Sequence, residues 1–241
     1  MLGADCSSNP PILNGSSGAG YVANFGGVSS YIIGSHLSLL AIVLVSDVYG
    51  YKTPNLRKIA DKVAAAGYFV VVPDFFHGDP FDRNNTNRPM PVWIKDHQPD
   101  KGVETAKPII EALKRQGVSA IGAAGFCWGG KTVVDLANSG EIQVAVLSHP
   151  TYVTVDDIER INIPIAILGG QNDTAFPPAK LHQFAQILNA KKPKVDSYAK
   201  VFPNVAHGWT LRYGPNDPKA VKAAEEAHKD MLNWFDKHLK H

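Results

Sequence analysis

The most informative stretch of this sequence is Gly125-Phe126-Cys127-Trp128-Gly129-Gly130. It follows a run of small apolar residues, 120–124, which we predict to be a buried strand, and it opens a helical pattern over about 129–137. Glycines two positions before and two positions after Cys127 predict a tight turn in which larger side chains would collide. The start of the helix would supply backbone N–H groups and a positive dipole end to the thiol. This context is typical of a nucleophile elbow with cysteine in place of serine; the alternative is a glycine-rich turn around a structural cysteine.

Strands and helices alternate on both sides of this stretch. We predict strands at 21–25, 28–33, 41–45, 69–72, 120–124, 144–147, 163–168 and 197–202, and helices at 55–66, 103–114, 129–137, 178–188 and 218–239. A glycine pair joins the first two strands as an antiparallel hairpin. The alternation predicts an α/β fold with a mostly parallel sheet of about eight strands and helices on both faces.

The chain has no composition shift that would separate two domains. Residues 1–18 are rich in Ser, Gly, Pro and Asn, and we expect a flexible N-terminal arm. Residues 19–241 then form a single domain. Within it, residues 75–99 contain four prolines and little periodicity, which is typical of a functional, lid-like excursion.

Two residues at later strand ends complete a candidate triad with Cys127. Asp173 follows the strand that ends near Leu168, and His207 follows the strand that ends near Phe202. Ligands bind beyond the carboxyl ends of the strands in such sheets, and the order nucleophile, acid, base is the one that this arrangement requires. Each residue has a simpler alternative, since Asp173 could cap the helix after Pro177 and His207 could be a surface imidazole.

Composition excludes several classes of protein. The formal net charge is +2 over 241 residues and the basic residues are scattered, so we expect neither a nucleic-acid nor a membrane partner. Two cysteines are too few for a disulfide framework or a four-thiolate zinc site, and we expect no metal. No glycine-rich phosphate loop follows a strand, so we expect no cofactor.

The sequence shows no leader pattern near its start, and its longest apolar run, 39–45, is far too short to span a bilayer. We therefore expect a cytoplasmic protein. The oligomeric state stays open between a monomer and a homodimer.

These motifs resemble the dienelactone hydrolase (carboxymethylenebutenolidase-like) family of α/β-hydrolases over nearly the whole chain. The resemblance rests on Gly125 to Lys131, Gly170-Gln171-Asn172-Asp173, Ala206-His207-Gly208 and Val45 to Gly50. An Asn9-Pro10-Pro11 arm is similar to that of the plant and fungal branch. The resemblance implies the α/β-hydrolase fold.

The resemblance also implies roles for residues around the thiol. A carboxylate at the first strand end helps to activate the cysteine in bacterial members, and Asp47 stands at the matching place where they have Glu. Asp47 could instead only cap a loop. The backbone N–H groups of Trp128 and Val48 would form the oxyanion hole.

Family members bind a substrate carboxylate with two arginines. Arg212 is one candidate, and Arg88 or Arg83 is the other, although both of the latter could be solvated loop residues. The candidate substrate-binding residues are Arg212, Arg88, Arg83, Tyr49, Phe126 and Trp209.

The expected activity is hydrolysis of a small-molecule ester or enol lactone by Cys127, His207 and Asp173 through a thioester acyl-enzyme. Two alternatives stay open. One is cleavage of cell-wall 1,3;1,4-β-glucan, with which grass members of the family are associated. The other is an inactive hydrolase scaffold that binds a small ligand.

Overall fold

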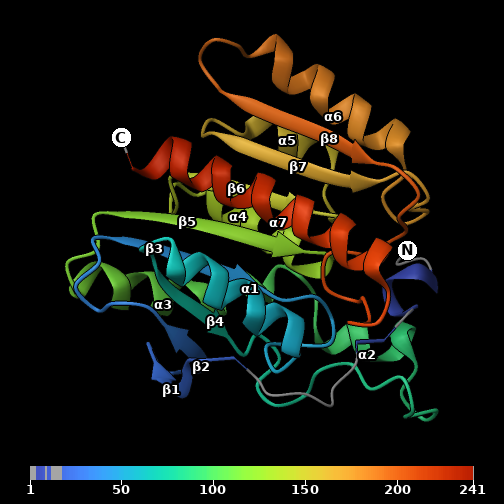
Figure 1. Ribbon diagram of the computed structural model, residues 1–241, viewed down its shortest axis with the longest axis horizontal. Helices are drawn as coiled ribbons and strands as arrows, with labels where there is room; N and C mark the ends of the chain where they lie inside the picture. The colour runs from blue at the N-terminus through green and yellow to red at the C-terminus, as the bar shows by residue number, and fades with distance from the viewer. Residues whose placement is uncertain (1–3, 9, 12–17, 241) are drawn as a thin grey trace.

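An eight-stranded sheet runs through the computed structural model, which describes residues 4–8, 10–11 and 18–240 (Figure 1). The strand order is β1-β2-β4-β3-β5-β6-β7-β8. The strands are β1 (Tyr21–Phe25), β2 (Val28–Ile33), β3 (Leu40–Val45), β4 (Phe69–Pro73), β5 (Ala120–Phe126), β6 (Val144–Ser148), β7 (Ile165–Gly170) and β8 (Ser197–Phe202). The six strands from β4 to β8 are parallel, whereas β1 and β2 are antiparallel to each other and β2 is antiparallel to β4. The predicted fold class is therefore confirmed.

Helices cover both faces of this sheet. They are η1 (Ala4–Ser7, a 3-10 turn), α1 (Pro54–Ala65), α2 (Met90–Asp96), α3 (Lys101–Arg115), α4 (Trp128–Asn138), α5 (Val155–Arg160), α6 (Pro178–Ala190) and α7 (Pro218–Leu239). Figure 1 shows α1 and α7 in front of the sheet. The chain of contacts α3 to α4 to α5 to α6 forms the layer on the other face.

Each face of the sheet has its own apolar core. Ile109, Val133 and Phe184 belong to the core under α3 to α6. Ile59 and Phe235 belong to the core under α1 and α7. Because both faces are covered, β3 and β4 are almost continuously apolar and buried, as central parallel strands require. The sheet is thus a rigid support for the loops at its carboxyl edge.

Three helical segments are absent from the expected elements: η1, α2 and α5. The first lies in the predicted N-terminal arm, of which residues 1–3, 9 and 12–17 lie outside the described residues. The second lies in the 75–99 segment, which is otherwise irregular. The strands β5 and β7 also run two residues beyond their predicted ends, to Phe126 and Gly170, so they carry the chain closer to the candidate site.

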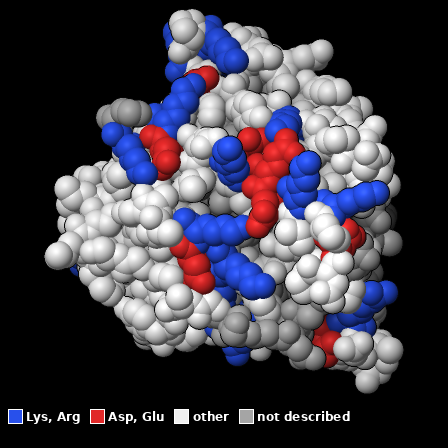
Figure 2. Space-filling model, viewed as in Figure 1, with Lys and Arg blue, Asp and Glu red and all other residues white. Residues whose placement is uncertain are grey.

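Basic and acidic side chains alternate on the face formed by α1 and α7 (Figure 2). Ion pairs such as Lys62–Glu225 and Lys200–Asp230 join neighbouring elements there. Among the described residues, the helices are each too short or too polar to cross a lipid bilayer.

Candidate active site

The turn that carries Cys127 has the geometry that its glycine spacing predicts. Cys127 adopts φ 52° and ψ −112° between the last residue of β5 and the first of α4. This left-handed backbone is unusual for a residue with a side chain and stores local strain. A Cβ atom on Gly125 would lie 2.3 Å from the Gly129 carbonyl oxygen, and one on Gly129 would lie 2.4 Å from that of Val45. Both positions therefore require glycine for the turn to form.

Asp173 and His207 meet at the same edge of the sheet. Asp173 lies in the loop after β7, and its Oδ2 atom is 2.8 Å from Nδ1 of His207, in the loop after β8. Its Oδ1 atom accepts the backbone N–H groups of Ala175 and Phe176, which fixes the carboxylate in its own loop. Both side chains are fully buried. Asp173 thus orients the imidazole as well as closing a local turn.

The other imidazole nitrogen of His207 faces two thiols. Nε2 of His207, Sγ of Cys127 and Sγ of Cys6 all lie within 4.8 Å of one another. The Cys6 sulfur is 3.8 Å from His207 Nε2, and the Cys127 sulfur is 3.9 Å from Thr151 Oγ1. Cys6 comes from η1, so the start of the described chain packs directly onto this site. Sequence reasoning assigned Cys6 no role, because no local pattern connects it with Cys127.

Charges favour an ion pair between Cys127 and His207. Burial alone would raise the pKa of the Cys127 thiol, but the hydrogen bond from Cys6 and the positive charge of His207 hold it well below its ordinary value. Burial alone would lower the pKa of His207, but the charge of Cys127 and the hydrogen bond to Asp173 raise it to about 9. Both shifts favour the thiolate form of Cys127 and the imidazolium form of His207.

Asp47 and Arg212 form a second buried pair beside the thiols. The Arg212 Nε–H donates to Asp47 Oδ2 at 2.8 Å, and the Tyr49 backbone N–H donates to Asp47 Oδ1 at 3.0 Å. Burial raises the pKa of Asp47, and the positive charge of Arg212 opposes that rise. Asp47 thus binds Arg212 and Tyr49, and its contribution to Cys127 is electrostatic.

The same pair anchors the N-terminal segment. A second nitrogen of Arg212 donates to the Ser8 carbonyl oxygen at 3.1 Å, and the Tyr49 hydroxyl donates to that of Ser7 at 2.8 Å. The Arg212 guanidinium also stands 5.0 Å from the centre of the Tyr49 ring. These contacts hold residues 7 and 8 beside Cys6 above the thiolate.

The residues expected to form the oxyanion hole are Trp128, which follows Cys127 in the chain, and Val48. Val48 follows β3 and is fully buried, and its carbonyl oxygen accepts the Phe81 N–H at 2.9 Å. The Trp128 indole N–H donates to the His97 carbonyl oxygen at 2.8 Å. The ring centres of Trp128 and Phe76 are 4.8 Å apart. The 75–99 segment is thus packed onto the residue that follows Cys127.

The remaining predicted binding residues lie in different surroundings. Arg88 binds Asp79 at 2.6 Å and Asp96 at 2.7 Å, within the 75–99 segment. Arg83 is exposed, and its positive charge opposes the rise that burial causes in the pKa of the Tyr49 hydroxyl. Phe126 is buried in the core under α1 and α7.

Sequence reasoning also assigned no role to His149, a fully buried imidazole. Its ring centre is 5.0 Å from that of His207, and its Nε2 is 2.7 Å from Thr210 Oγ1. Burial, together with the positive charges of His207 and Arg212, holds the pKa of His149 well below its ordinary range. His149 is therefore a neutral neighbour that packs against the charged imidazole. The sequence signal that could have placed His149 near the site is its position directly after the strand β6.

A cavity of about 560 Å³ opens on the His207 side of the site. His207, Trp209 and Arg212 line it together with residues from the start of α7. The indole nitrogen of the buried Trp209 has no hydrogen-bond partner among the described residues. The cavity is of the size that holds a small organic ligand.

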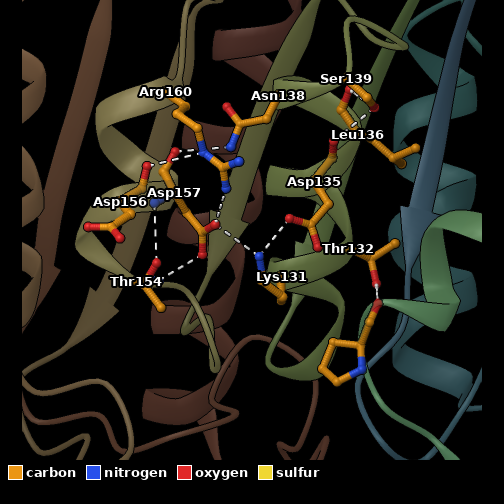
Figure 3. A network of polar contacts seen from close by, with 11 residues as sticks. Lys131, Thr132, Asp135, Leu136, Asn138, Ser139, Thr154, Asp156, Asp157 and Arg160 are labelled. Atoms are coloured by element: carbon orange, nitrogen blue, oxygen red, sulfur yellow. Dashed lines mark hydrogen bonds and ion pairs between the residues drawn. The ribbon is translucent and has the colours of Figure 1, made fainter.

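A polar network holds the helix that follows Cys127 (Figure 3). The Lys131 ammonium on α4 contacts Asp135 Oδ1 at 2.6 Å and Asp157 Oδ1 at 2.9 Å. Asp157 on α5 also binds Arg160 and forms a capping box with Thr154. Burial alone would raise the pKa of Asp157, but the hydrogen bonds from Thr154 and Lys131 lower it below its ordinary value. The network ties the first turns of α4 to α5.

Thiol sulfurs and imidazole nitrogens are also common ligands of soft metal ions. Among the described residues, Cys6, Cys127 and His207 are the group whose donor atoms converge in this way. The sequence alone predicted no metal, because the two cysteines are far apart in it.

Comparisons with known proteins agree with this architecture. A model of the dienelactone hydrolase family matches residues 28–239. An endo-1,3;1,4-β-D-glucanase of Zea mays is 45% identical over 69% of this chain, and the match spans only 54% of the maize protein. A carboxymethylenebutenolidase homolog of Xenopus tropicalis is 30% identical over 88% of both chains.

Solved structures give the same fold. A dienelactone hydrolase from Anabaena variabilis superimposes with a TM-score of 0.67, covers 93% of this chain and 100% of its own, and is 13% identical. The family match spans the sheet from β2 to the end of α7 and includes every strand end that carries Cys127, Asp173 or His207. From its sequence and its fold alike, this chain is a member of the dienelactone hydrolase family and hence of a family of hydrolases.

Proposed function

We propose that the protein hydrolyses a small carboxylic ester or enol lactone with Cys127 as nucleophile, His207 as acid and base, and Asp173 as the residue that orients His207. The observation that carries this proposal is the position of His207. One of its nitrogens is 2.8 Å from Asp173, and the other lies within 4.8 Å of the Cys127 sulfur. The depressed pKa of Cys127 supports the role of nucleophile.

The reaction follows from the ion pair. The Cys127 thiolate attacks the carbonyl carbon, and the N–H groups of Trp128 and Val48 donate to the developing oxyanion. The carbon–oxygen bond of the ester breaks, and the leaving oxygen takes the proton from His207 Nε2. A water molecule then loses a proton to His207 and attacks the thioester, which releases the acid and restores the thiolate.

The thiolate restricts the substrate class. It leaves a tetrahedral intermediate more readily than an amine does, so amide intermediates collapse backwards. Esters, enol lactones and thioesters have better leaving groups and are the substrates that this site suits. The cavity beside His207, which Trp209 helps to line, would hold the acyl or lactone ring.

Substrate access requires a movement of the N-terminal segment. Cys127 and Cys6 are both 0% exposed, so a carbonyl carbon cannot reach the sulfur while η1 lies over it. Residues 7 and 8 are held by the hydrogen bonds from Tyr49 and Arg212. We expect the segment to lift when substrate binds.

The proposal is tested by the hydrolysis of p-nitrophenyl acetate and of a dienelactone. Cys127→Ala and His207→Ala are expected to lower kcat/KM by roughly 10⁴-fold or more. His182→Ala, which removes an exposed imidazole from α6, is the matched control and should keep the wild-type rate. Rates within about twofold of wild type in both site variants would overturn the proposal. Stoichiometric labelling of Cys127 without turnover would identify an inactive ligand-binding scaffold.

The similarity to the maize endo-1,3;1,4-β-D-glucanase favours a second candidate, cleavage of mixed-linkage glucan. Glycoside hydrolysis ordinarily needs two free carboxylates across a sugar cleft. The carboxylates near the site are engaged: Asp47 by Arg212, Asp74 by backbone N–H groups and Asp79 by Arg88 and His97. Reducing-sugar release from 1,3;1,4-β-glucan that survives Cys127→Ala would support the glucanase. If Cys127→Ala abolishes reducing-sugar release, the glucanase activity depends on the triad.

A further inference from the structure

The two cysteines of this chain lie together although they are far apart in sequence. Cys6 and Cys127 are both free thiols with no exposed surface, and their sulfurs lie within 4.8 Å of each other. Cys6 stands on the four-residue turn η1, which lies outside the sheet, whereas Cys127 stands on the turn between β5 and α4. One sulfur can therefore move toward the other without disturbing the sheet.

We infer that Cys6 and Cys127 are a redox pair, in which peroxide oxidises Cys127 and Cys6 then resolves the product to a disulfide that shuts the active site. The inference rests on the proposed function only for its effect on activity. The disulfide itself depends on the position of the two thiols, whose sulfurs lie within 4.8 Å of each other.

The surroundings of the two sulfurs assign them different roles, because Cys127 lies at the start of α4 beside His207, whereas Cys6 stands on η1. The hydrogen bond from Cys6 and the charge of His207 lower the pKa of the Cys127 thiol, and the thiolate is the form that attacks peroxide. The hydrogen bond to Cys127, together with burial, raises the pKa of Cys6, so it stays a thiol. Cys127 is thus the sulfur that reacts first, and Cys6 is preserved as the resolving cysteine.

His207 can carry the protons of both steps. In the first step the Cys127 thiolate attacks one peroxide oxygen, a sulfur–oxygen bond forms, the oxygen–oxygen bond breaks, and the departing hydroxide takes the His207 proton as water. In the second step the neutral His207, 3.8 Å from Cys6, accepts the Cys6 proton. The Cys6 sulfur then attacks the Cys127 sulfenic acid, and hydroxide leaves with the same proton. One peroxide is reduced to two waters while two thiols become one disulfide.

The geometry of the segment allows the bond to form. The sulfurs must approach from within 4.8 Å to the bonded distance of about 2 Å. The neighbouring residues are held by contacts that include the hydrogen bonds from Tyr49 to the Ser7 carbonyl oxygen and from Arg212 to the Ser8 carbonyl oxygen. The resulting disulfide would remove the nucleophile and tie η1 over the site. It would also protect Cys127 from irreversible oxidation to the sulfinic acid.

The test uses the full chain, stripped of metal with a chelator and treated with hydrogen peroxide. Intact mass, free thiols under denaturing conditions and p-nitrophenyl acetate hydrolysis are followed before and after dithiothreitol. Wild type is expected to lose both thiols and two hydrogen atoms of mass, and dithiothreitol should restore thiols and activity together. Cys6→Ser should instead gain two or three oxygen atoms at Cys127, and dithiothreitol should not restore its activity.

Cys127→Ser is the control for the order of events, since its remaining Cys6 thiol should resist peroxide. Wild type that gains oxygen atoms without forming a disulfide would overturn the inference. So would a Cys6→Ser variant that recovers as fully as wild type. A disulfide in a protein without esterase activity would overturn the proposed function and leave the redox pair standing, because mass and thiol content do not depend on hydrolysis.

Discussion

The ion pair between Cys127 and His207 determines how the reactivity of the thiol depends on pH. An ordinary thiol is alkylated faster as pH rises toward its pKa near 8.5, because more thiolate is present. The hydrogen bond from Cys6 and the charge of His207 hold the pKa of Cys127 well below its ordinary value. The rate of Cys127 alkylation by iodoacetamide, followed on its peptide by mass spectrometry, is therefore expected to be flat between about pH 7 and 9.

Hydrolysis has a second limit, because the leaving oxygen needs the proton of His207. The rate is expected to fall as pH rises through about 9, the pKa of this imidazolium. His207→Ala removes the positive charge, raises the pKa of Cys127 and should restore the rise in alkylation with pH. A wild-type alkylation rate that climbs tenfold per pH unit up to 9 would contradict the ion pair.

The glycines of the turn give a prediction about stability. Gly129→Ala would place a Cβ atom 2.4 Å from the Val45 carbonyl oxygen, so the turn has to shift. The free energy of unfolding in urea is expected to fall by about 1–3 kcal/mol, with a loss of esterase activity. Gly140→Ala is the control for backbone strain alone, because its φ is +74° and nothing lies within 4 Å of the added atom, whereas Gly129 lies in helix α4 and has no positive φ. A Gly129→Ala variant as stable as wild type would show that the close packing is unimportant.

At the scale of elements, the network between α4 and α5 contains two cations that bind the same carboxylate oxygen but differ in exposure. We expect them to contribute differently to stability. Lys131 is 20% exposed and Arg160 is 63% exposed, and both contact Asp157 Oδ1. Lys131→Met leaves the buried Asp157 short of a partner and should lower the free energy of unfolding by about 1–3 kcal/mol. Arg160→Met should cost less than about 1 kcal/mol.

The pH dependence of this network has a definite sign. The pKa of Asp157 is lowered in the folded protein, so its contribution is present above the unfolded pKa and is lost as pH falls through the folded one. The difference between wild type and Lys131→Met should therefore shrink in acid. A difference that is the same at neutral and at strongly acidic pH would show that Lys131 acts by packing alone.

The segment that contains η1 gives a prediction about access. Deletion of residues 1–8 removes Cys6 and the two carbonyl oxygens that Tyr49 and Arg212 bind. Cys127 should then be alkylated by iodoacetamide faster than in wild type, because the segment no longer covers its sulfur. Slower or unchanged labelling of Cys127 would show that other residues close the site.

The sequence carried signals for most elements, but some were missed. Continuous apolar runs predicted β3 and β4 because strands covered on both faces have no other pattern. α5 was missed although Thr154 and Asp157 have the spacing of a capping box. α2 was missed because four prolines and little periodicity predict an irregular segment over 75–99, whereas proline is compatible with the first turn of a helix.

At the scale of the whole molecule, one sheet separates two cores and couples them. Phe235 on α7 is fully buried against β5, and Trp93 and Trp128 lie on the opposite face. Phe235→Ala is expected to cost about 3–5 kcal/mol. Trp209 and Trp234 lie in the same core as Phe235, so fluorescence is measured in a Trp209→Phe, Trp234→Phe background, where it reports on Trp93 and Trp128. This fluorescence and far-ultraviolet circular dichroism should shift to the same lower urea midpoint. The half-buried Leu232→Ala is the control, and separate midpoints would show that the faces unfold independently.

The site was only partly predictable, because some of its residues follow from the order of the strands and others from long-range packing. The order of Cys127, Asp173 and His207 could be read from strand ends, since parallel strands bring their carboxyl ends to one edge. The contact with Cys6 depends on where the chain start packs after the domain has formed. No periodicity, turn or spacing encodes that packing.

The location of η1 has a practical consequence for anyone who handles this protein. In Figure 1 the first described residues lie at the edge where the strands end, and α7 finishes at the opposite edge. A purification tag fused to the N-terminus would be joined to the segment that packs against the thiols, and it is expected to alter the kinetics. The same tag fused after α7 would sit far from the chemistry and leave the measured rates representative.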